Sequence, residues 1–307
     1  MHWRVKGLIQ KVLSFMPGGV WLNTLLQQVS GGMRDFDSNV AIKIDDWSLS
    51  MGYLSEVDFS VSGARLMEIG TGWHPAFPLC FALAGASSIA TFDIVRLLDE
   101  TMTFKLLDSL EKHVPKIAEL AGETPATIHD RLLDYCGSKN LGELLGKSRI
   151  EYFAPADGCA TGLEADSVDL VYSNSVLEHV PREVIRGLME ESFRVLKPGG
   201  LVMHNVACND HYATFDKSIS YVNYLRYEER EWRLWNNPIQ YQNRLRAPEF
   251  VGLAAQAGFE IISNRTYICP GTLEALASMR LAPQFEHFSK DEIAPTTEDF
   301  IGRKPDR

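Results

Sequence analysis

The sequence has few cysteines, and their spacing gives no sign of shared chemistry. There are five in 307 residues, with no Cys-x-x-Cys pair: Cys80, Cys136, Cys159, Cys208 and Cys269. Because they lie far apart in the chain, neither a disulfide framework nor a zinc site is expected. A reducing, cytoplasmic environment fits this usage better.

Long apolar runs and an excess of positive charge are also lacking. No apolar run is long enough to cross a bilayer, so stable membrane insertion is not expected. The formal net charge is -10, which argues against a general nucleic-acid binder, because such proteins carry a basic footprint. The composition, with 45% apolar and 23% charged residues, is ordinary for a globular protein with a proper core.

The N-terminus resembles a signal peptide only in part, because Gln10 and Lys11 interrupt its apolar stretch and no small-residue cleavage site follows. One helical face collects the apolar side chains, opposite Arg4, Lys6 and Lys11: Leu8, Ile9, Val12, Phe15 and Met16. This spacing predicts a helix that packs on the domain through its apolar face, with a membrane-surface helix as the alternative.

Short apolar runs alternate with helical patterns from residue 64 onward. Strands are predicted at 65–70, 88–93, 149–154, 167–174, 201–207, 259–268 and near 299–305, with helices between them. The alternation predicts an α/β protein with a Rossmann-like, doubly wound parallel sheet. Residues 1–60 are expected to form an N-terminal helical cap segment, and residues 61–307 the main domain. Ligands of such sheets bind beyond the carboxyl ends of the strands.

The loop after the first predicted strand, in "RLMEIGTGWHPAF", departs from a dinucleotide-binding turn. Gly70 and Gly72 permit a tight turn and close approach of a ligand, but Pro75 stands where that fingerprint has its third glycine. Glu68 at the strand end would repel a pyrophosphate and attract a cation. S-adenosyl-L-methionine carries an ammonium and a sulfonium group and no phosphate, so it suits this loop better than a nicotinamide dinucleotide.

Five segments in order carry a resemblance: "EIGTG", "TFD", "PAD", "VDLVYSNSVLEHV" and "VLKPGGLV". Together they resemble the class I S-adenosylmethionine-dependent methyltransferases, in the small-molecule, type 11-like branch. The likeness covers about residues 64–206 and continues more weakly to the C-terminus. It implies a seven-stranded sheet whose last strand is antiparallel. It also implies that Glu68 and the backbone of Gly70, Thr71 and Gly72 hold the methionine part of the cofactor.

Asp93 closes the second predicted strand, where a carboxylate can accept hydrogen bonds from two ribose hydroxyls. Dehydrogenases use an acid in the same way, so Asp93 supports a nucleoside without choosing between the cofactors. The alternative is an aspartate that only caps the strand end.

The resemblance implies further cofactor contacts. Asp157 would accept from the adenine amino group, with Gly158 and Cys159 lining the adenine plane; a surface-turn aspartate is the alternative. Ser173 and Asn174 would lie beside the sulfonium. The sequence "SNSV" replaces the Asn-Pro-Pro-Tyr of enzymes that methylate adenine or glutamine amino groups, which argues against those acceptors.

Residues 207–247 follow the fifth predicted strand and are too many for an ordinary connection. They are rich in Tyr, Trp, Asn and Arg, which pack and still offer hydrogen bonds, so we interpret them as a substrate lid. Tyr241, Asn243 and Arg244 are candidate substrate-binding residues. Arg244 would grip an anionic group or pair with a lid glutamate. His179 joins the set because the resemblance places it near the acceptor, although in that branch it is more often structural.

Methyl transfer to an alcohol or amine needs alignment and removal of a proton. His211 is the first candidate for the base and His204 the second; each has a structural role as its alternative. No metal cluster is evident in the sequence, so metal-independent transfer is predicted.

The expected reaction is transfer of a methyl group from S-adenosyl-L-methionine to an oxygen or nitrogen of a small-molecule metabolite. A NAD(P)-dependent oxidoreductase and a non-catalytic S-adenosylmethionine-binding protein are the alternatives. The acidic balance argues against a nucleic-acid acceptor, and the lid against a large protein. The N-terminal segment is expected to serve as a lid or as the contact of a homodimer.

Overall fold

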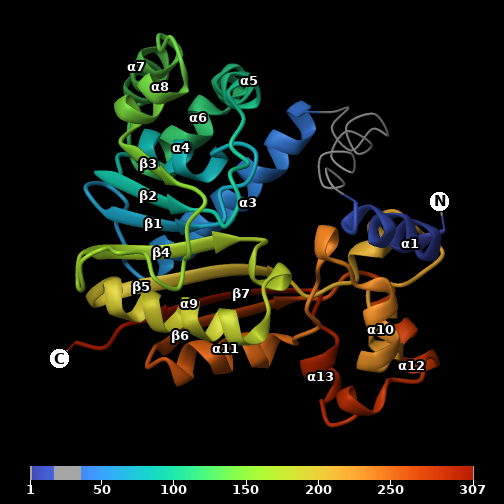
Figure 1. Cartoon of the computed structure of the whole chain (residues 1–307). Coiled ribbons are helices and arrows are strands. Elements are labelled where there is room, and N and C mark those ends of the chain that lie inside the picture. The colour runs from blue at the N-terminus through green and yellow to red at the C-terminus, as the bar shows by residue number, and fades with distance from the viewer. Residues whose placement is uncertain (1, 17–35, 307) are drawn as a thin grey trace.

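The computed structural model describes residues 2–16 and 36–306, and its centre is a seven-stranded sheet (Figure 1). The strand order is β3-β2-β1-β4-β5-β7-β6. The strands are β1 (Arg65–Ile69), β2 (Ser88–Phe92), β3 (Ile150–Phe153), β4 (Val168–Asn174), β5 (Leu196–Ala207), β6 (Glu260–Tyr267) and β7 (Thr297–Arg303). The first five are parallel, and β7 is antiparallel to both β5 and β6, which confirms the predicted sheet.

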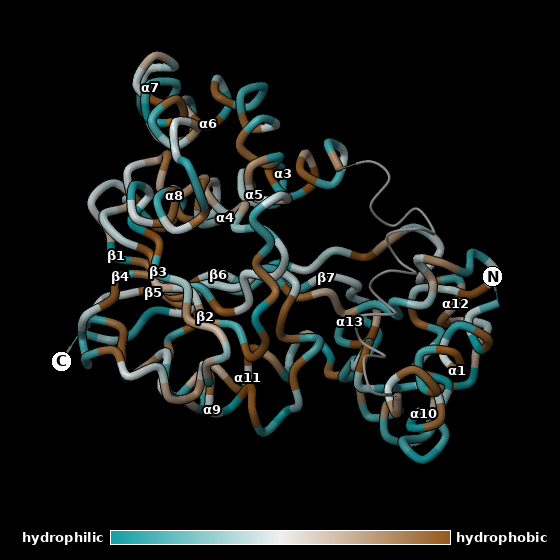
Figure 2. Tube along the Cα trace, turned by 45° about the horizontal axis from the view of Figure 1, so that its top comes forward, coloured by the Kyte–Doolittle hydropathy of each residue, from teal (hydrophilic) through white to brown (hydrophobic). Residues whose placement is uncertain are grey.

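Helices cover both faces of the sheet, because successive strand residues point to opposite sides and both sides are apolar. Leu66 and Leu170 face α3 (Phe36–Glu56) and α4 (Ala76–Leu83). Their neighbours, such as Met67, face α9 (Arg182–Val195) and α11 (Ala247–Gln256). Figure 2 shows hydrophobic residues along β1 and β4 and mixed colours along α9 and α11, as expected of helices that bury one side. No helix in the described part of the chain is long and apolar enough to span a membrane.

The predicted helical stretch between the second and third strands contains four α-helices. It forms α5 (Glu100–Leu110), α6 (Val114–Ala121), α7 (Pro125–Cys136) and α8 (Leu141–Ser148). Gly122 ends α6 in the left-handed conformation, and Thr124 caps α7 by accepting a hydrogen bond from the Thr127 N–H.

The lid residues form a third apolar cluster with segments distant in sequence. It contains α1 (Trp3–Ser14), η3 (His211–Thr214), η4 (Asn223–Arg226), α10 (Glu229–Trp235), η5 (Pro238–Gln240), α12 (Thr272–Ser278), η6 (Pro283–Phe285) and α13 (Lys290–Ile293). In Figure 1, α1, α10, α12 and α13 lie together to one side of the sheet. The N-terminal segment therefore divides: α1 joins the lid, and α3 joins the main core.

The packed face of α1 is the opposite of the predicted one. Trp3 and Gly7 are buried, whereas Phe15 is 79% exposed. The aromatic ring of Trp3 anchors the helix among Tyr212 and Trp235, and the backbone N–H of Trp3 donates to Asp216 at 2.9 Å. Large aromatic rings bury more surface than the aliphatic face offers, which explains the orientation. The predicted face is exposed: Leu8, Ile9, Val12, Phe15 and Met16.

Candidate functional site

A pocket of about 470 Å³ lies at the carboxyl ends of β1, β2 and β4, where the topology predicts a ligand. Six predicted cofactor residues line it: Glu68, Gly70, Thr71, Gly72, Asp93 and Asn174. Trp73, His74 and Lys43 also line it and were not predicted. The fold therefore brings together residues from three strand ends and from α3.

The turn after β1 depends on its two glycines for different reasons. Gly70 and Gly72 have φ of +80° and +73°, which side chains rarely adopt. A Cβ on Gly70 would lie 2.5 Å from Cγ2 of Val176, so packing also demands glycine there. A Cβ on Gly72 would meet nothing within 4 Å, so this glycine borders open space in the pocket.

Glu68 places a carboxylate at the pocket although the side chain is only 4% exposed. The Thr91 hydroxyl donates to its Oε2 at 2.9 Å, and the Thr71 hydroxyl contacts that of Thr91. Burial raises the pKa of Glu68 to about 7. A cation in the pocket would stabilise the ionised form, which is what an ammonium or sulfonium group provides.

Asp93 follows β2 and points into the same pocket. The Gly72 N–H donates to its Oδ2 at 3.1 Å and the Tyr152 hydroxyl at 3.3 Å, so the carboxylate is held in place. Desolvation raises the pKa of Asp93 to about 6, so it is mostly ionised at neutral pH and accepts hydrogen bonds. This geometry suits binding of paired hydroxyls.

The residues predicted around adenine lie in the loop after β3, outside the pocket lining. Asp157 is exposed, and its Oδ1 accepts from the Cys159 N–H at 2.8 Å. Gly158 packs closely, since a Cβ there would lie 2.8 Å from Cδ2 of Leu188. Their assignment to adenine stays a prediction.

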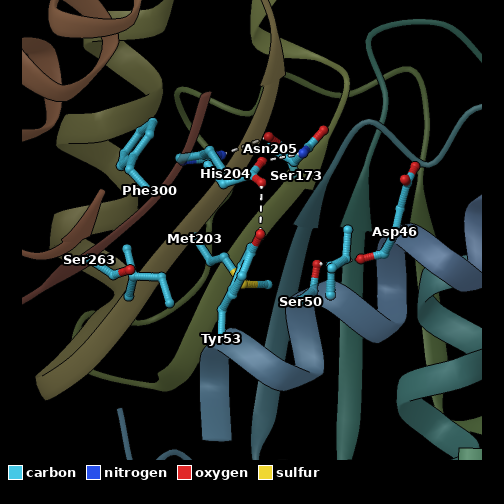
Figure 3. Close-up of a pocket in the computed structure, with 12 residues that line it drawn as sticks. Asp46, Ser50, Tyr53, Ser173, Met203, His204, Asn205, Ser263 and Phe300 are labelled. Carbon is cyan, nitrogen blue, oxygen red and sulfur yellow. Dashed lines mark hydrogen bonds between the residues drawn. The ribbon is translucent and has the colours of Figure 1, made fainter. Parts of the chain in front are cut away.

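Ser173 and His204 lie beside a small cavity of about 20 Å³ next to the pocket (Figure 3). The Ser173 hydroxyl and Nδ1 of His204 are 2.7 Å apart, and both side chains are buried. Desolvation lowers the pKa of His204 to about 3. His204 is therefore a buried partner of Ser173 and does not have the access that a general base needs, which corrects its second place among the candidates.

Polar residues of α3 connect this cavity with the pocket. The Lys43 ammonium donates to Oδ1 of Asn174 at 2.5 Å, and the Asn174 amide donates to Asp46 at 3.4 Å. The Tyr53 hydroxyl donates to Asp299 at 3.3 Å, as the dashed line in Figure 3 marks. Lys43, Asp46 and Tyr53 are spaced to share one face of α3, and this spacing was a sequence signal for the polar face that was not among the predictions.

A second pocket, of about 540 Å³, is an open hollow between the lid and the turn that carries His179. Its lining includes Glu229, Arg233, Asn236 and Tyr241 from the lid and His179 from the main domain. His179 also lines the first pocket. The two pockets therefore share His179. Tyr241, one of the predicted substrate-binding residues, lines the second pocket.

Arg244 and Asn243 make internal contacts. Arg244 is 8% exposed and donates to Glu229 at 2.8 Å and to the Tyr224 carbonyl at 3.0 Å. Its guanidinium thus pairs with a lid glutamate, which was the stated alternative to binding an anionic group of the substrate. The Asn243 amide donates to the carbonyls of Leu177 and Val180, each at 2.7 Å, so it holds the turn that carries His179.

His211 lies against His179, with ring centroids 4.9 Å apart. Desolvation, with smaller effects of His179 and Lys6, lowers the pKa of His211 to about 3. It is neutral at pH 7 and has little affinity for a proton in this state, so its role as general base stays a prediction.

Comparisons with known proteins agree with this geometry. A model described as a methyltransferase domain matches residues 50–264, more than two thirds of the chain. An uncharacterized methyltransferase of Mycobacterium bovis (strain BCG / Pasteur 1173P2) is 51% identical over 51 residues, which are 17% of this chain and 19% of that protein. The match thus spans about a fifth of the curated relative.

Two similar solved structures are S-adenosylmethionine-dependent methyltransferases. The protein from Methanosarcina mazei is 15% identical with a TM-score of 0.46, over 80% of this chain and 94% of that one. The protein from Mesorhizobium loti is 16% identical with a TM-score of 0.41, over 82% and 96%.

Proposed function

Since the chain belongs to the family of methyltransferase domains and its cofactor is S-adenosyl-L-methionine, we propose that it methylates an oxygen or nitrogen of a small-molecule metabolite. The observation that carries the proposal is the pair of pockets that meet at His179. One contains the polar groups that this cofactor needs, and the other is walled mostly by lid residues.

The residues of the first pocket fit the cofactor. Glu68 is a buried carboxylate with a raised pKa and would hold the cationic methionine part. Asp93, oriented by Gly72 and Tyr152, would accept from the ribose hydroxyls. Gly72 leaves space for close approach. When bound, the cofactor supplies a methyl group that its positive sulfur has already activated.

The chain's own contribution is then mainly alignment and desolvation. Lys43 and Asn174 form a polar edge of the first pocket, and Asn174 also donates to Asp46, which lines the small cavity. The lid restrains the His179 turn through Asn243 and places Tyr241 across the second pocket. Holding an acceptor in such a site converts a bimolecular encounter into an oriented reaction, which contributes several kcal/mol.

A small acceptor is favoured by the size and the lining of the second pocket. Its volume of about 540 Å³ is in the range of small-molecule sites, roughly 300–1,000 Å³. The lining combines an aromatic ring with amide, carboxylate and guanidinium groups, which suits a polar metabolite. The acidic net charge argues against a nucleic-acid acceptor.

Calorimetric titration tests the cofactor site. S-adenosylhomocysteine is expected to bind wild type, NAD is not, and Asp93→Ala is expected to weaken binding. Incubation of a metabolite extract with deuteromethyl donor and enzyme, followed by mass spectrometry, would identify the acceptor by its label. Label found only on protein or nucleic acid would contradict the proposal.

A further inference from the structure

Three potential metal-ligating side chains meet where the two pockets join. Glu178 and His179 belong to η2 (Leu177–His179), and His211 begins η3, beyond the end of β5. One donor atom from each lies within 4.8 Å of the other two. The strands β4 and β5 are neighbours in the sheet, so their carboxyl ends bring together residues more than thirty positions apart.

The lid fixes both halves of this cluster. Nδ1–H of His179 donates to the Tyr241 carbonyl at 2.7 Å, which orients the ring and leaves Nε2 with a free lone pair. Asn243 donates its backbone N–H to the Glu178 carbonyl at 2.8 Å. Gln242 accepts from the His211 N–H at 3.2 Å. Three consecutive lid residues thus fix the backbone of Glu178 and His211 and the ring of His179, and the bond to the ring is of the kind that outer residues of metal sites make to a ligand.

Glu178 supplies an independent indication of a ligand. Its side chain is 1% exposed, and no side chain among the described residues pairs with its carboxylate, whose polar neighbours are the backbone groups of Glu178 and Ala207. Leaving a buried carboxylate without a cationic partner is costly, and buried charges normally pair or coordinate a metal. A cation held between Glu178 and the two imidazoles would satisfy it.

We propose that Glu178, His179 and His211 bind a divalent first-row transition-metal ion. Two imidazole nitrogens and one carboxylate oxygen suit Zn²⁺, Fe²⁺, Co²⁺ or Mn²⁺ better than Mg²⁺ or Ca²⁺, which prefer oxygen ligands. Three protein ligands leave coordination positions open, as in catalytic sites. The proposal replaces the prediction of metal independence, because these three residues come together only in the folded chain.

The position of the ion defines its use. His179 lines both pockets, so an ion bound to it would lie beside the junction of the cofactor and acceptor sites. An acceptor that carries an oxygen donor, such as a hydroxyl group beside a carbonyl or a carboxylate, would complete the coordination. This last step rests on the proposed function, whereas binding of the metal does not.

Titration of the full-length, untagged chain tests the site after removal of metal with a chelator. Co²⁺ is added under anaerobic conditions, and its visible absorption spectrum reports the geometry around the ion. Calorimetric titration with Zn²⁺ gives the affinity. We expect one ion per chain, Co²⁺ bands of a non-octahedral site, and a higher thermal unfolding midpoint with metal. His211→Gln and Glu178→Gln should abolish this binding, and Asn243→Ala should weaken it by roughly 10- to 100-fold.

His129→Gln is the matched control, because His129 also lies beside a carboxylate, Glu111 at 3.1 Å, but on the surface of α7. It should bind metal as wild type does. A cooperative thermal unfolding transition of each variant in chelator shows that the metal-free protein is folded. Titration of the same samples with S-adenosylhomocysteine reports separately on the cofactor site. A wild-type chain without stoichiometric binding, or equal binding by the His211→Gln and wild-type proteins, would overturn the proposal.

Discussion

Alanine at Gly70 should destabilise the protein more than alanine at Gly72, although the two glycines have nearly the same backbone conformation. Each substitution places a side chain at positive φ, which costs about 1–2 kcal/mol. At Gly70 the new Cβ would also lie 2.5 Å from Val176, and overpacking adds about 1–3 kcal/mol. The expected losses of unfolding free energy are therefore about 2–5 kcal/mol for Gly70→Ala and about 1–2 kcal/mol for Gly72→Ala.

Urea unfolding, followed by circular dichroism, gives these differences, with Gly63→Ala as the control. Gly63 has φ of +78° and no neighbour within 4 Å of a built Cβ, but it lies before β1 and away from the pocket. It should lose about as much stability as Gly72→Ala. In calorimetry, only the Gly72 variant of these two should bind S-adenosylhomocysteine more weakly, since its methyl group enters the pocket.

The double variant Gly70→Ala/Val176→Ala separates the two contributions. Removing both γ-carbons of Val176 should recover the overpacking part, about 1–3 kcal/mol, and leave the backbone strain. A Gly70→Ala protein no less stable than Gly63→Ala would refute the packing argument. A Gly72→Ala protein with unchanged cofactor affinity would refute the position of the ligand.

Other measurements test the electrostatics of the site and the lid. Burial raises the pKa of Glu68 to about 7 from 4.5, so the folded state binds this proton more tightly. The contribution of Glu68 to ligand-free stability should fall as pH rises from about 4.5 to 7, by at most about 1.4 kcal/mol per pH unit. Other buried acids such as Asp93 act in the same direction, so Glu68→Gln should make the fall shallower than in wild type, and an equally steep fall in both proteins would contradict the assignment. Lys43→Met should weaken S-adenosylhomocysteine binding about tenfold by calorimetry, because Asn174 loses a charge-assisted hydrogen bond, whereas the exposed Lys105→Met should not. Arg244→Met should lower lid stability by about 1–3 kcal/mol in limited proteolysis, because the carbonyls of Tyr224 and Tyr227 lose their donor, and Arg233→Met, at the 77% exposed Arg233, should match wild type.

Most residues of the cofactor pocket could be predicted from local sequence patterns. Glu68, the two glycines and Asp93 stand at the ends of strands whose apolar runs were evident along the chain. Parallel strands place their carboxyl ends at one edge, so predicting the strands also predicted that these residues would meet. Lys43 was not predicted as a pocket residue, because its helix was assigned to a separate cap segment and nothing in its local sequence indicates the contact with Asn174.

The orientation of polar side chains in the lid could not be predicted from the sequence. Its length and aromatic content indicated a substrate cover, but Arg244 finds Glu229 within the lid instead of facing a ligand. His204, at a strand end like the true pocket residues, faces the core and Ser173. Which way a polar side chain turns depends on neighbours from other segments, and those neighbours are not adjacent in sequence.

The sequence by itself determined the order of strands and helices and the binding turn after β1, because hydrophobic period and glycine conformation are local properties. The seven-stranded sheet with its antiparallel last strand was implied by the resemblance of five short segments to a known family. Tertiary structure alone decided which face of α1 is buried, which polar residues line a pocket, and that Glu178, His179 and His211 meet. These outcomes depend on competition between distant surfaces for burial and on the pairing of buried polar groups, which act only once the chain has packed.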